Sequence, residues 1–576
     1  MSYFDIPRLH FYGSFFASPS TINNIDSNFK EPPVLQKLWN PQGEHNFQLL
    51  QGNEPILPPG ATVTPCTVTG IVNAAGKFTT DPSVDSLIGQ LLVSTNNPSF
   101  AKLVDLDPDQ QQVSQVWGLQ LSIGAAGQAL VADFVATNFQ QIFVTRAPGG
   151  FGSGFSAAYQ SQLVNLQWPQ TIKSALLNSW QTAGAEVLSI RFTVDLLDVP
   201  AQFQGDPNFR IGRIAGTIGP SSADEPQSIT IGRLLRPVQP APVQVAPGAA
   251  KESIEVAAAA ADAATINQNL SYAPALVDTT RNVVTFDLGN SLTFNSDGTP
   301  GNSGTLQAAI LTPNGAIVLG PIDDTLDNYQ QRAYLFEFPL GQHSADAASN
   351  PLVILSDGDV VLSENPSGAW IDAAEHVYRM DAGTTASATL YATTFGATAA
   401  DGQTVSLSVF AFPRPTGAPW PDPTTPLTVT PATVTLTNGT ATFQISAGTP
   451  GNPRGAIDGL VYGIQFAWSD DTNPVQNLFV SVHVYDAFSV PATPKWTDVQ
   501  PIFHQFMVLY PAMKAILNLD DPATVKANAS TIAQFLSFPI TNPMHMPVTR
   551  DLSGPKTAML LKYLAAQGTK PKPKPH

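Results

Sequence analysis

Apolar residues recur at alternate positions through most of the chain, up to about residue 490. In the opening stretch Leu9, Phe11 and Phe15 alternate with polar or smaller residues, which is the period of a strand with one buried face. The same alternation returns in residues 116–134 and 187–197, and Pro, Asn and Gly separate such runs. In the last of these runs the apolar face comprises Leu188, Ile190, Phe192, Val194 and Leu196. The pattern predicts a mainly β protein.

Two short segments before residue 300 are exceptions to the β pattern. A short helix is predicted for Ser156 to Leu163, after a glycine-rich loop, and another for the alanine-dense stretch from Glu255 to Ala264. Glycines before a helix N-terminus can bind phosphate through backbone N–H groups. The glycines at 149, 150, 152 and 154 do not fit the G-x-G-x-x-G spacing, so a flexible loop is favoured over a nucleotide site.

The clearest domain by pattern lies between residues 386 and 490. Val434 and Leu436, the Asn438-Gly439 turn, and the alternating run to Ile445 predict a β-hairpin with one apolar face. About seven short strands in roughly 100 residues are typical of an immunoglobulin-like sandwich. Such sandwiches usually bind or space other parts and do not catalyse reactions.

A helical period replaces the strand period after Pro494. Val499, Ile502, Phe503 and Phe506 recur at the spacing of one buried helical stripe. A second helix is predicted for residues 523–538. A third is expected to begin near Ser553, with the serine hydroxyl as its cap, and to run to residue 566. The run from Met559 to Leu564 can pack against the first stripe, which predicts a closed helical cap.

These segments predict a mainly β, multi-domain protein. We expect sandwich or barrel-like β architecture, including the immunoglobulin-like sandwich, and a small helical carboxyl-terminal region. The expected domains are a first β domain over residues 1–240, a second β region over 241–385, the sandwich over 386–490 and the helical cap over 491–568. The lysine-proline tail over 569–576 is predicted to be disordered.

Charge and cysteine content narrow the possible functions. The 576 residues carry a net charge of −17, which repels phosphate backbones and anionic lipids, so neither nucleic acid nor a membrane is an expected partner. A single cysteine, Cys66, rules out an internal disulfide and any cysteine-based metal cluster. No window of eighteen uncharged apolar residues occurs, and a strand from residue 6 leaves no room for a signal peptide. We expect a cytoplasmic protein.

Several segments resemble one enzyme family. The opening Pro7-Arg8-Leu9-His10-Phe11-Tyr12-Gly13, with the Thr/Asn-rich turn after it, is similar to the amino terminus of the violacein-pathway iminophenylpyruvate dimer synthases and their chromopyrrolate synthase relatives. Further segments match in the same order. They are Val104-Asp105-x-Asp107-Pro108, Gln115-Val116-Trp117-Gly118-x-Gln120, Gly232-Arg233-Leu234-Leu235-Arg236-Pro237, the helix of His504 with Tyr510-Pro511, and Met546-Pro547-x-Thr549-Arg550-Asp551-Leu552-Ser553-x-Pro555-Lys556 with Leu561-Lys562-Tyr563-Leu564.

The resemblance implies the amino-terminal module of that family. In those enzymes the chain continues into a ferritin-like helical domain whose Glu and His residues bind iron, whereas no Glu-x-x-His motif occurs in this sequence. The implied function is that of a module in specialised-metabolite biosynthesis, around oxidative coupling of aryl α-imino acids. A separately encoded redox partner could supply the missing domain.

Three residues are candidates for ligand binding. Arg8 and His10 share one face of the first strand, where an arginine and a histidine could hold an arylpyruvate carboxylate. The alternative, which we favour, is that they pin the strand to a neighbouring segment. His504 lies at the flank of its helical stripe, where a partly buried histidine in a satisfied contact is favoured over a haem or metal ligand. No metal site and no cofactor are predicted, and haem and iron stay open.

Two functions therefore stand against each other. One is the dimer-synthase-like module, with a small aromatic ligand. The other is a non-catalytic β scaffold that binds a ligand or a protein. Whether the chain is an enzyme is not decided by the sequence, and an absorption spectrum with metal analysis separates the two hypotheses.

Overall fold

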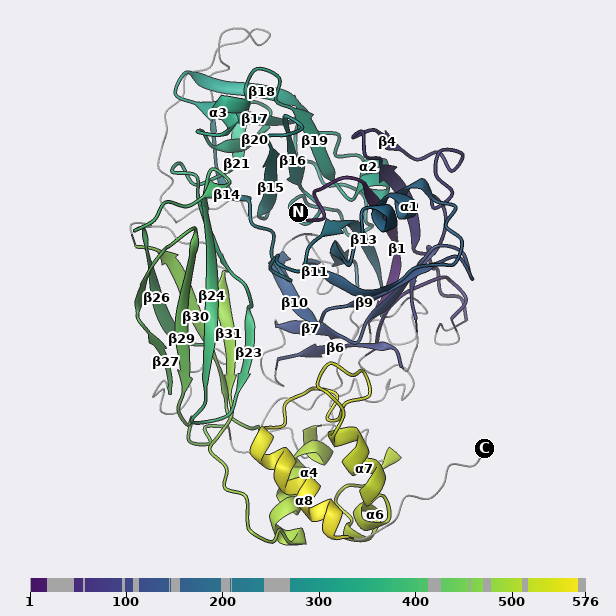
Figure 1. Cartoon of the computed structure of the whole chain (residues 1–576), viewed down its shortest axis with the longest axis vertical. Helices are drawn as coiled ribbons and strands as arrows, with labels where there is room; N and C mark the ends of the chain where they lie inside the picture. The colour runs from purple at the N-terminus through teal and green to yellow at the C-terminus, as the bar shows by residue number, and fades with distance from the viewer. Residues whose placement is uncertain are drawn as a thin grey trace.

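The computed structural model describes residues 2–17, 46–54, 57, 59–95, 99–106, 113–143, 146, 156–197, 208, 210–242, 270–412, 426–454, 457–469, 478–509 and 516–567. Figure 1 shows three β units and one helical unit: a barrel at the right, a curled sheet above it, a sandwich at the left and helices at the bottom. The prediction of a mainly β, multi-domain protein with helices near its carboxyl end is confirmed. The helix expected at Glu255–Ala264 and the tail over 569–576 lie outside the described residues.

The first unit is a closed antiparallel barrel. Its ring runs β10-β7-β6-β2-β1-β13-β12-β11, and pairing of β10 with β11 closes it. The ring strands are β1 (Arg8–Ala17), β2 (Asn46–Leu49), β6 (Ala101–Asp105), β7 (Ser114–Trp117), β10 (Thr137–Phe143), β11 (Ser156–Gln167), β12 (Val187–Asp195) and β13 (Ile211–Ser221). Outside the ring lie β3 (Thr67–Val72), β4 (Phe78–Thr79), β5 (Leu92–Ser94), β8 (Gln120–Ile123), β9 (Leu130–Phe134) and α1 (Ala175–Thr182).

Aromatic rings fill the barrel core. Phe192 on β12 lies 5.3 Å from the ring of Tyr159 and 6.2 Å from that of Phe47, and Phe47 lies 5.6 Å from Phe15. Leu9, Phe11 and Phe15 are all buried in this core, as the alternation on β1 predicts. The helix expected at Ser156–Leu163 is wrong: the segment is β11, because its backbone pairs with β12 along all eight positions.

The second unit is an eight-stranded sheet that curls into a near-barrel, in the order β18-β17-β20-β21-β14-β15-β16-β19. Its elements are β14 (Arg233–Pro242), β15 (Ala273–Asp278), β16 (Val283–Asp287), β17 (Leu306–Thr312), β18 (Gly315–Pro321), α2 (Leu326–Arg332), β19 (Leu335–Pro339), α3 (Ser344–Ala347), β20 (Leu352–Ser356) and β21 (Asp359–Ser363). The domain boundary expected at residue 240 falls inside β14.

The third unit is a two-sheet sandwich. One sheet holds β22 (Ala369–Ala373), β24 (Thr385–Thr394), β25 (Ala397–Thr398), β27 (Leu427–Thr430) and β29 (Thr440–Ala447). The other holds β23 (Val377–Met380), β26 (Thr404–Ala411), β28 (Thr433–Thr435), β30 (Leu460–Trp468) and β31 (Phe479–Val484). The sandwich thus starts before the expected residue 386.

The hairpin expected around Asn438-Gly439 differs from the structure. The turn forms, but β28 pairs with β26 and β29 pairs with β24, so the two strands belong to opposite sheets. Val434 and Ile445 are nevertheless buried in one core, because both sheets turn their apolar faces toward each other. Alternation predicted the buried face correctly but not the partner strand.

The helical unit comprises α4 (Trp496–Leu509), α6 (Pro522–Ala527), α7 (Ala529–Leu536) and α8 (Gly554–Ala566). Val499, Ile502 and Phe503 on α4 share a core with Met559 to Leu564 on α8, so the two predicted stripes bury each other. Helix α8 begins directly after Ser553, as predicted, and Ser553 is its N-cap residue. The prediction that the Ser553 hydroxyl caps the helix is wrong: among the described residues this hydroxyl has no partner, and Asp381 accepts from Gly554 N at 3.0 Å instead. Within the described ranges, no helix is both long and apolar enough to span a membrane.

Candidate functional site

The outer face of the barrel is polar and yet buried. On β1, β12 and β13 the residues that alternate with the barrel core point toward the second sheet. They include Arg8, His10, Arg191, Thr193, Asp195, Arg213 and Thr217, all under 9% exposed. Charged groups buried in this way need partners, because desolvation of an unpaired charge costs several kcal/mol. This junction is the candidate site.

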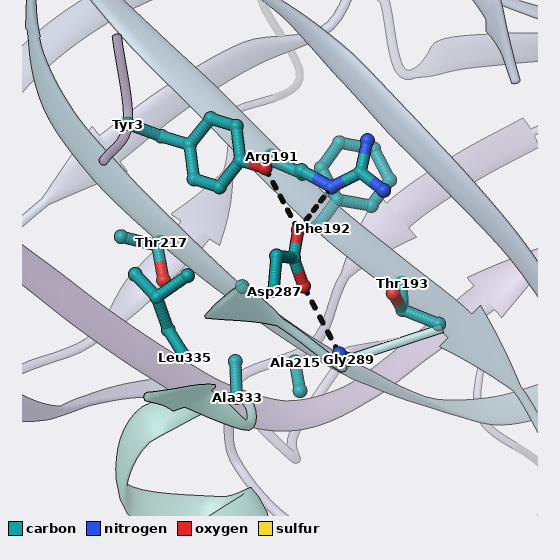
Figure 2. Close-up of a pocket in the computed structure, with 11 residues that line it drawn as sticks. Tyr3, Arg191, Phe192, Thr193, Ala215, Thr217, Asp287, Gly289, Ala333 and Leu335 are labelled. Atoms are coloured by element: carbon teal, nitrogen blue, oxygen red, sulfur yellow. Dashed lines mark hydrogen bonds and ion pairs between the residues drawn. The ribbon is translucent and has the colours of Figure 1, made fainter. Parts of the chain in front are cut away.

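Asp287, at the end of β16, is the centre of the junction. Tyr3 OH donates to its Oδ2 at 2.9 Å, Arg191 Nε donates to the same oxygen, and Gly289 N donates to Oδ1 at 3.0 Å. Figure 2 shows the three groups converging on the carboxylate from three different segments. Burial, followed by the negative charge of Asp287, raises the pKa of Tyr3 well above its ordinary value, so the phenol stays a donor.

A cavity lies beside this carboxylate. Its lining includes Arg191, Thr217 and Leu335, and its free space is about 10 Å³. That is room for about one water molecule. An aryl keto acid does not fit into this space, so the cavity as it stands is not a substrate pocket.

A second carboxylate, Asp195 at the end of β12, joins the network. Arg213 binds it with two parallel hydrogen bonds, at 2.8 Å and 2.7 Å, and Arg146 Nη1 lies 3.5 Å from the same side chain. Arg213 also donates to Gly298 O at 2.7 Å, and its guanidinium lies 4.1 Å from the Phe294 ring centre. Bidentate arginine pairs fix both distance and orientation.

Arg8 and His10 lie on the same outer face of β1, as expected from alternation. Arg8 donates to Phe4 O and to Glu337 Oε2 on β19, and burial lowers its pKa to about 10. His10 Nδ1 lies 2.8 Å from Thr217 Oγ1 on β13, and burial, then the nearby Arg8, lowers its pKa well below the ordinary value. Their side chains are 2% and 1% exposed, so both groups contact other parts of the protein and not the solvent.

His504 lies far from these residues in the fold. It belongs to α4 in the helical unit, which lies apart from β1 at the bottom of the view (Figure 1). Its side chain is 56% exposed and pairs with Asp520 Oδ1 at 2.9 Å. The three candidate ligand-binding residues therefore do not form one site, and His504 is exposed where partial burial was expected.

The segment around Trp117, which resembles a dimer-synthase segment, lies at a junction between units. Gln115 on β7 accepts from Arg379 on β23 of the sandwich. The guanidiniums of Arg379 and Arg550 lie 5.7 Å and 5.1 Å from the Trp117 ring, and Tyr485 OH donates to Arg550 O at 3.1 Å. Burial, then the charge of Arg379, lowers the pKa of Arg550 to about 9. Barrel, sandwich and helical unit thus meet at one indole.

The Gly232–Pro237 segment has the same kind of position. Arg233 Nε donates to Glu364 Oε1 at 2.7 Å, and its guanidinium lies 5.5 Å from the Phe395 ring of the sandwich. Thr393 on β24 donates to Gly232 O at 2.7 Å. This segment therefore joins the second sheet to the sandwich.

Local patterns in the sequence do not single out Asp287, Arg191, Asp195 or Arg213. One signal was available, since Arg191 and Asp195 lie on the polar face of a strand whose other face is wholly apolar. Their partners lie 96 and 18 residues away along the chain, which no local pattern reveals. Among the residues that the structure describes, no group of three or more His, Cys, Asp or Glu side chains could hold a metal ion.

Comparisons with known proteins identify no family. No family model matches the chain, and no curated protein matches it. Among solved structures, it is similar to a chain of the chaperone-tip adhesin complex of CFA/I fimbriae, at 12% identity over 22% of this chain and 63% of that chain, with a TM-score of 0.16. It is also similar to domains 4 and 5 of the S-layer protein SbsC, at 13% identity over 24% of this chain and 64% of that chain, with a TM-score of 0.14. A third similar structure is a Salmonella alpha-2-macroglobulin mutant, at 11% identity over 70% of this chain and 27% of that chain, with a TM-score of 0.14.

The chain covers less than two thirds of the length of the first two of these structures. TM-scores of this size do not bear on the fold or the activity of this chain.

Proposed function

We propose that this chain is a non-catalytic β scaffold, which holds its units in a fixed arrangement and binds a partner across them. The observation behind the proposal is the buried ion-pair network between the barrel and the second sheet. Arg191, Asp195 and Arg213 of the barrel and Asp287 of the second sheet are all less than 9% exposed. Charged side chains that are buried and paired with each other are better suited to hold the units in position than to react with a substrate.

The energetics of this network support a fixed arrangement. Removing one partner of a buried ion pair costs about 3–5 kcal/mol, because the other charge stays buried without compensation. Sliding the second sheet along the barrel would break the Arg191–Asp287 pair and the Arg8–Glu337 pair together. A hinge at this junction is therefore disfavoured, which suits a scaffold.

We also propose that the sandwich is immunoglobulin-like. One sheet has the order β22-β24-β29-β27, and the other has β23-β31-β30-β26-β28 with β23 parallel to β31. The consecutive strands β22 and β23 lie at the edges of opposite sheets, and β23 runs parallel to β31, the last strand. This arrangement supports the assignment. Domains of this kind commonly bind or space other parts.

The dimer-synthase-like module is the second candidate, and one observation favours it. Four of the segments that carry the resemblance lie where units join, namely those around Arg8, Trp117, Arg233 and Arg550. A chain with this role would position a separately encoded redox partner and an aryl imine substrate, and the oxidative coupling would take place on the partner.

A coupling assay tests the scaffold proposal. Purified chain is incubated with an amino-acid oxidase and an aromatic amino acid, and the dimeric product is compared with an oxidase-only control. A scaffold leaves the yield at the control level, and an absorption spectrum shows no Soret band. Product that rises in proportion to the chain, or stoichiometric iron in the purified protein, would overturn the proposal.

A further coupling experiment tests the second candidate, the dimer-synthase-like module. A ferritin-like domain of a dimer synthase is produced separately and added with and without this chain. The dimer-synthase reading predicts more coupled product with the chain present, and bovine serum albumin at equal concentration controls for nonspecific stabilisation. Equal product in both samples would reject the second candidate and leave the scaffold proposal standing.

A further inference from the structure

The junction between barrel and second sheet has more hydrogen-bond donors than acceptors. Among the described residues, no protein group accepts from Arg146 Nε, Asn290 Nδ2 or Tyr329 OH, although all three atoms are buried. The three residues are 1%, 1% and 0% exposed. Buried polar atoms nearly always have a partner, and each orphan donor costs about 1–3 kcal/mol. Three such donors in one cluster call for a further acceptor.

The three donors belong to neighbouring residues around one phenyl ring. Arg146 Nη1 donates to Asn290 Oδ1 at 3.3 Å. The Arg146 guanidinium lies 4.6 Å from the Phe294 ring centre, and the Tyr329 ring lies 4.9 Å from that of Phe294. Arg146 also lies 5.7 Å from the Tyr329 ring centre. The three residues that carry the orphan donors therefore lie close together in the junction.

The charge of the linked network selects the kind of acceptor. Asp287 Oδ1 accepts from Gly289 N, Gly289 O accepts from Arg146, and Arg146 lies beside Asp195, so the two carboxylate clusters form one network. Counted over the residues that the structure describes, it contains three arginines and two aspartates, Arg146, Arg191 and Arg213 against Asp195 and Asp287, which makes a net charge of +1. A buried net charge is costly unless a counterion neutralises it.

We propose that this junction binds one small monovalent anion of the chloride class, held by Arg146, Asn290 and Tyr329. An anion can accept from all three donors and cancels the excess charge, whereas a water molecule accepts from two donors and carries no charge. The anion must be small, because the three residues that would hold it are almost completely buried. The inference is independent of the scaffold proposal, since it concerns stability and not partner binding.

Salt exchange on the full chain tests the site. The melting temperature is measured in sodium chloride and in sodium gluconate at equal ionic strength, because gluconate is too bulky for the cluster. Binding to the native state raises stability with ligand concentration. We expect the melting temperature to rise by several degrees with chloride and to saturate. Equal melting temperatures in the two salts would overturn the proposal and leave water as the acceptor.

Two variants of neighbouring tyrosines localise the effect. Tyr329→Phe removes one orphan donor, so the chloride-dependent rise should shrink, while stability in gluconate should stay equal or increase. Tyr334→Phe is the matched control, because the hydroxyl of Tyr334 in the same aromatic cluster donates to Asp324 O. It should lower stability equally in both salts. A chloride response that is unchanged in Tyr329→Phe would refute the site.

A third variant replaces the anion by a side chain. Asn290→Asp exchanges an orphan donor for a carboxylate oxygen and brings the network to neutrality. Its stability should not depend on chloride, and it should exceed the wild type in gluconate. Crystals of the wild type grown in bromide should show an anomalous peak next to Arg146. A peak that is absent there, or an Asn290→Asp variant that keeps the full chloride response, would contradict the assignment.

Discussion

Replacing Asp287 by Ala removes the group on which three segments of the junction converge. The charge of Arg191, a residue only 5% exposed, would lose the carboxylate that it pairs with. Tyr3 OH and Gly289 N would lose their acceptor. The substitution changes little volume, so the lost electrostatic contacts dominate its effect. The expected result is a large loss of stability at a position that no catalytic role explains.

The magnitude follows from burial. Removing one partner of a buried ion pair costs about 3–5 kcal/mol, and each orphaned neutral donor adds up to about 1–3 kcal/mol. These terms overlap, so we expect a loss of at least about 3 kcal/mol, against a typical net stability of about 5–15 kcal/mol. The exposed pair His343–Asp346, at 3.0 Å with the carboxylate 42% exposed, provides the matched control. Asp346→Ala should cost only about 0–1 kcal/mol.

The assay is urea unfolding of the full chain, followed by tryptophan fluorescence, with both variants and wild type measured side by side. The earliest transition should move to lower urea in Asp287→Ala and stay in place in Asp346→Ala. The double variant Arg191→Met/Asp287→Leu should lose less than Asp287→Ala, because no charge is left buried. If Asp287→Ala unfolds at the same urea concentration as Asp346→Ala, the reasoning about this junction is wrong.

Four further outcomes can be checked. Removing residues 1–16 should leave an insoluble or much less stable chain, since it deletes most of β1 and five buried Leu and Phe side chains worth about 1.5–3 kcal/mol each; an unchanged melting temperature would contradict this. Wild type should lose stability relative to His10→Gln as the pH falls below about 6.5, by up to about 1.4 kcal/mol per pH unit, because the unfolded histidine gains a proton that the native one does not; parallel pH curves would exclude it. Asp381→Ala should cost about 0.5–2 kcal/mol through the lost cap of α8, whereas Ser553→Ala should cost nothing, and the reverse order would show that the serine is the cap. His504→Ala should change stability by about 0–1 kcal/mol, and a larger loss would mean that its exposed pair matters.

Properties that depend on local periodicity could be predicted from the sequence. Alternation identified the buried faces of β1 and β12, since side chains in a strand alternate between its two sides whatever the strand pairs with. The i, i+3, i+4 spacing likewise identified the stripe of Val499 that packs on α8. Period fails where β11 was predicted as a helix, because short apolar runs do not distinguish the two states without knowledge of neighbouring strands.

Properties that depend on distant segments could not be predicted. The Arg8 partner on β19 lies 329 residues away, and α8 takes its cap from Asp381, 173 residues away. Arg8 and His10 were named correctly as a pair on one face, and the choice between ligand binding and a structural contact rested on what faces them. Only the fold supplies that opposite surface, which is why Asp287 was overlooked.

The antiparallel pairing of β1 with β13 has a consequence for how this protein is made. Leu9 lies opposite Ile218, so β1 cannot gain this neighbour in the ring until roughly 200 more residues have left the ribosome, which takes about 10–40 s at typical rates of synthesis. During that time Phe11, Phe15 and Phe16 lie on a strand without its main partner, and an unpaired apolar strand is a site of aggregation. Nascent chains of this protein should therefore depend on a holding chaperone until β13 emerges.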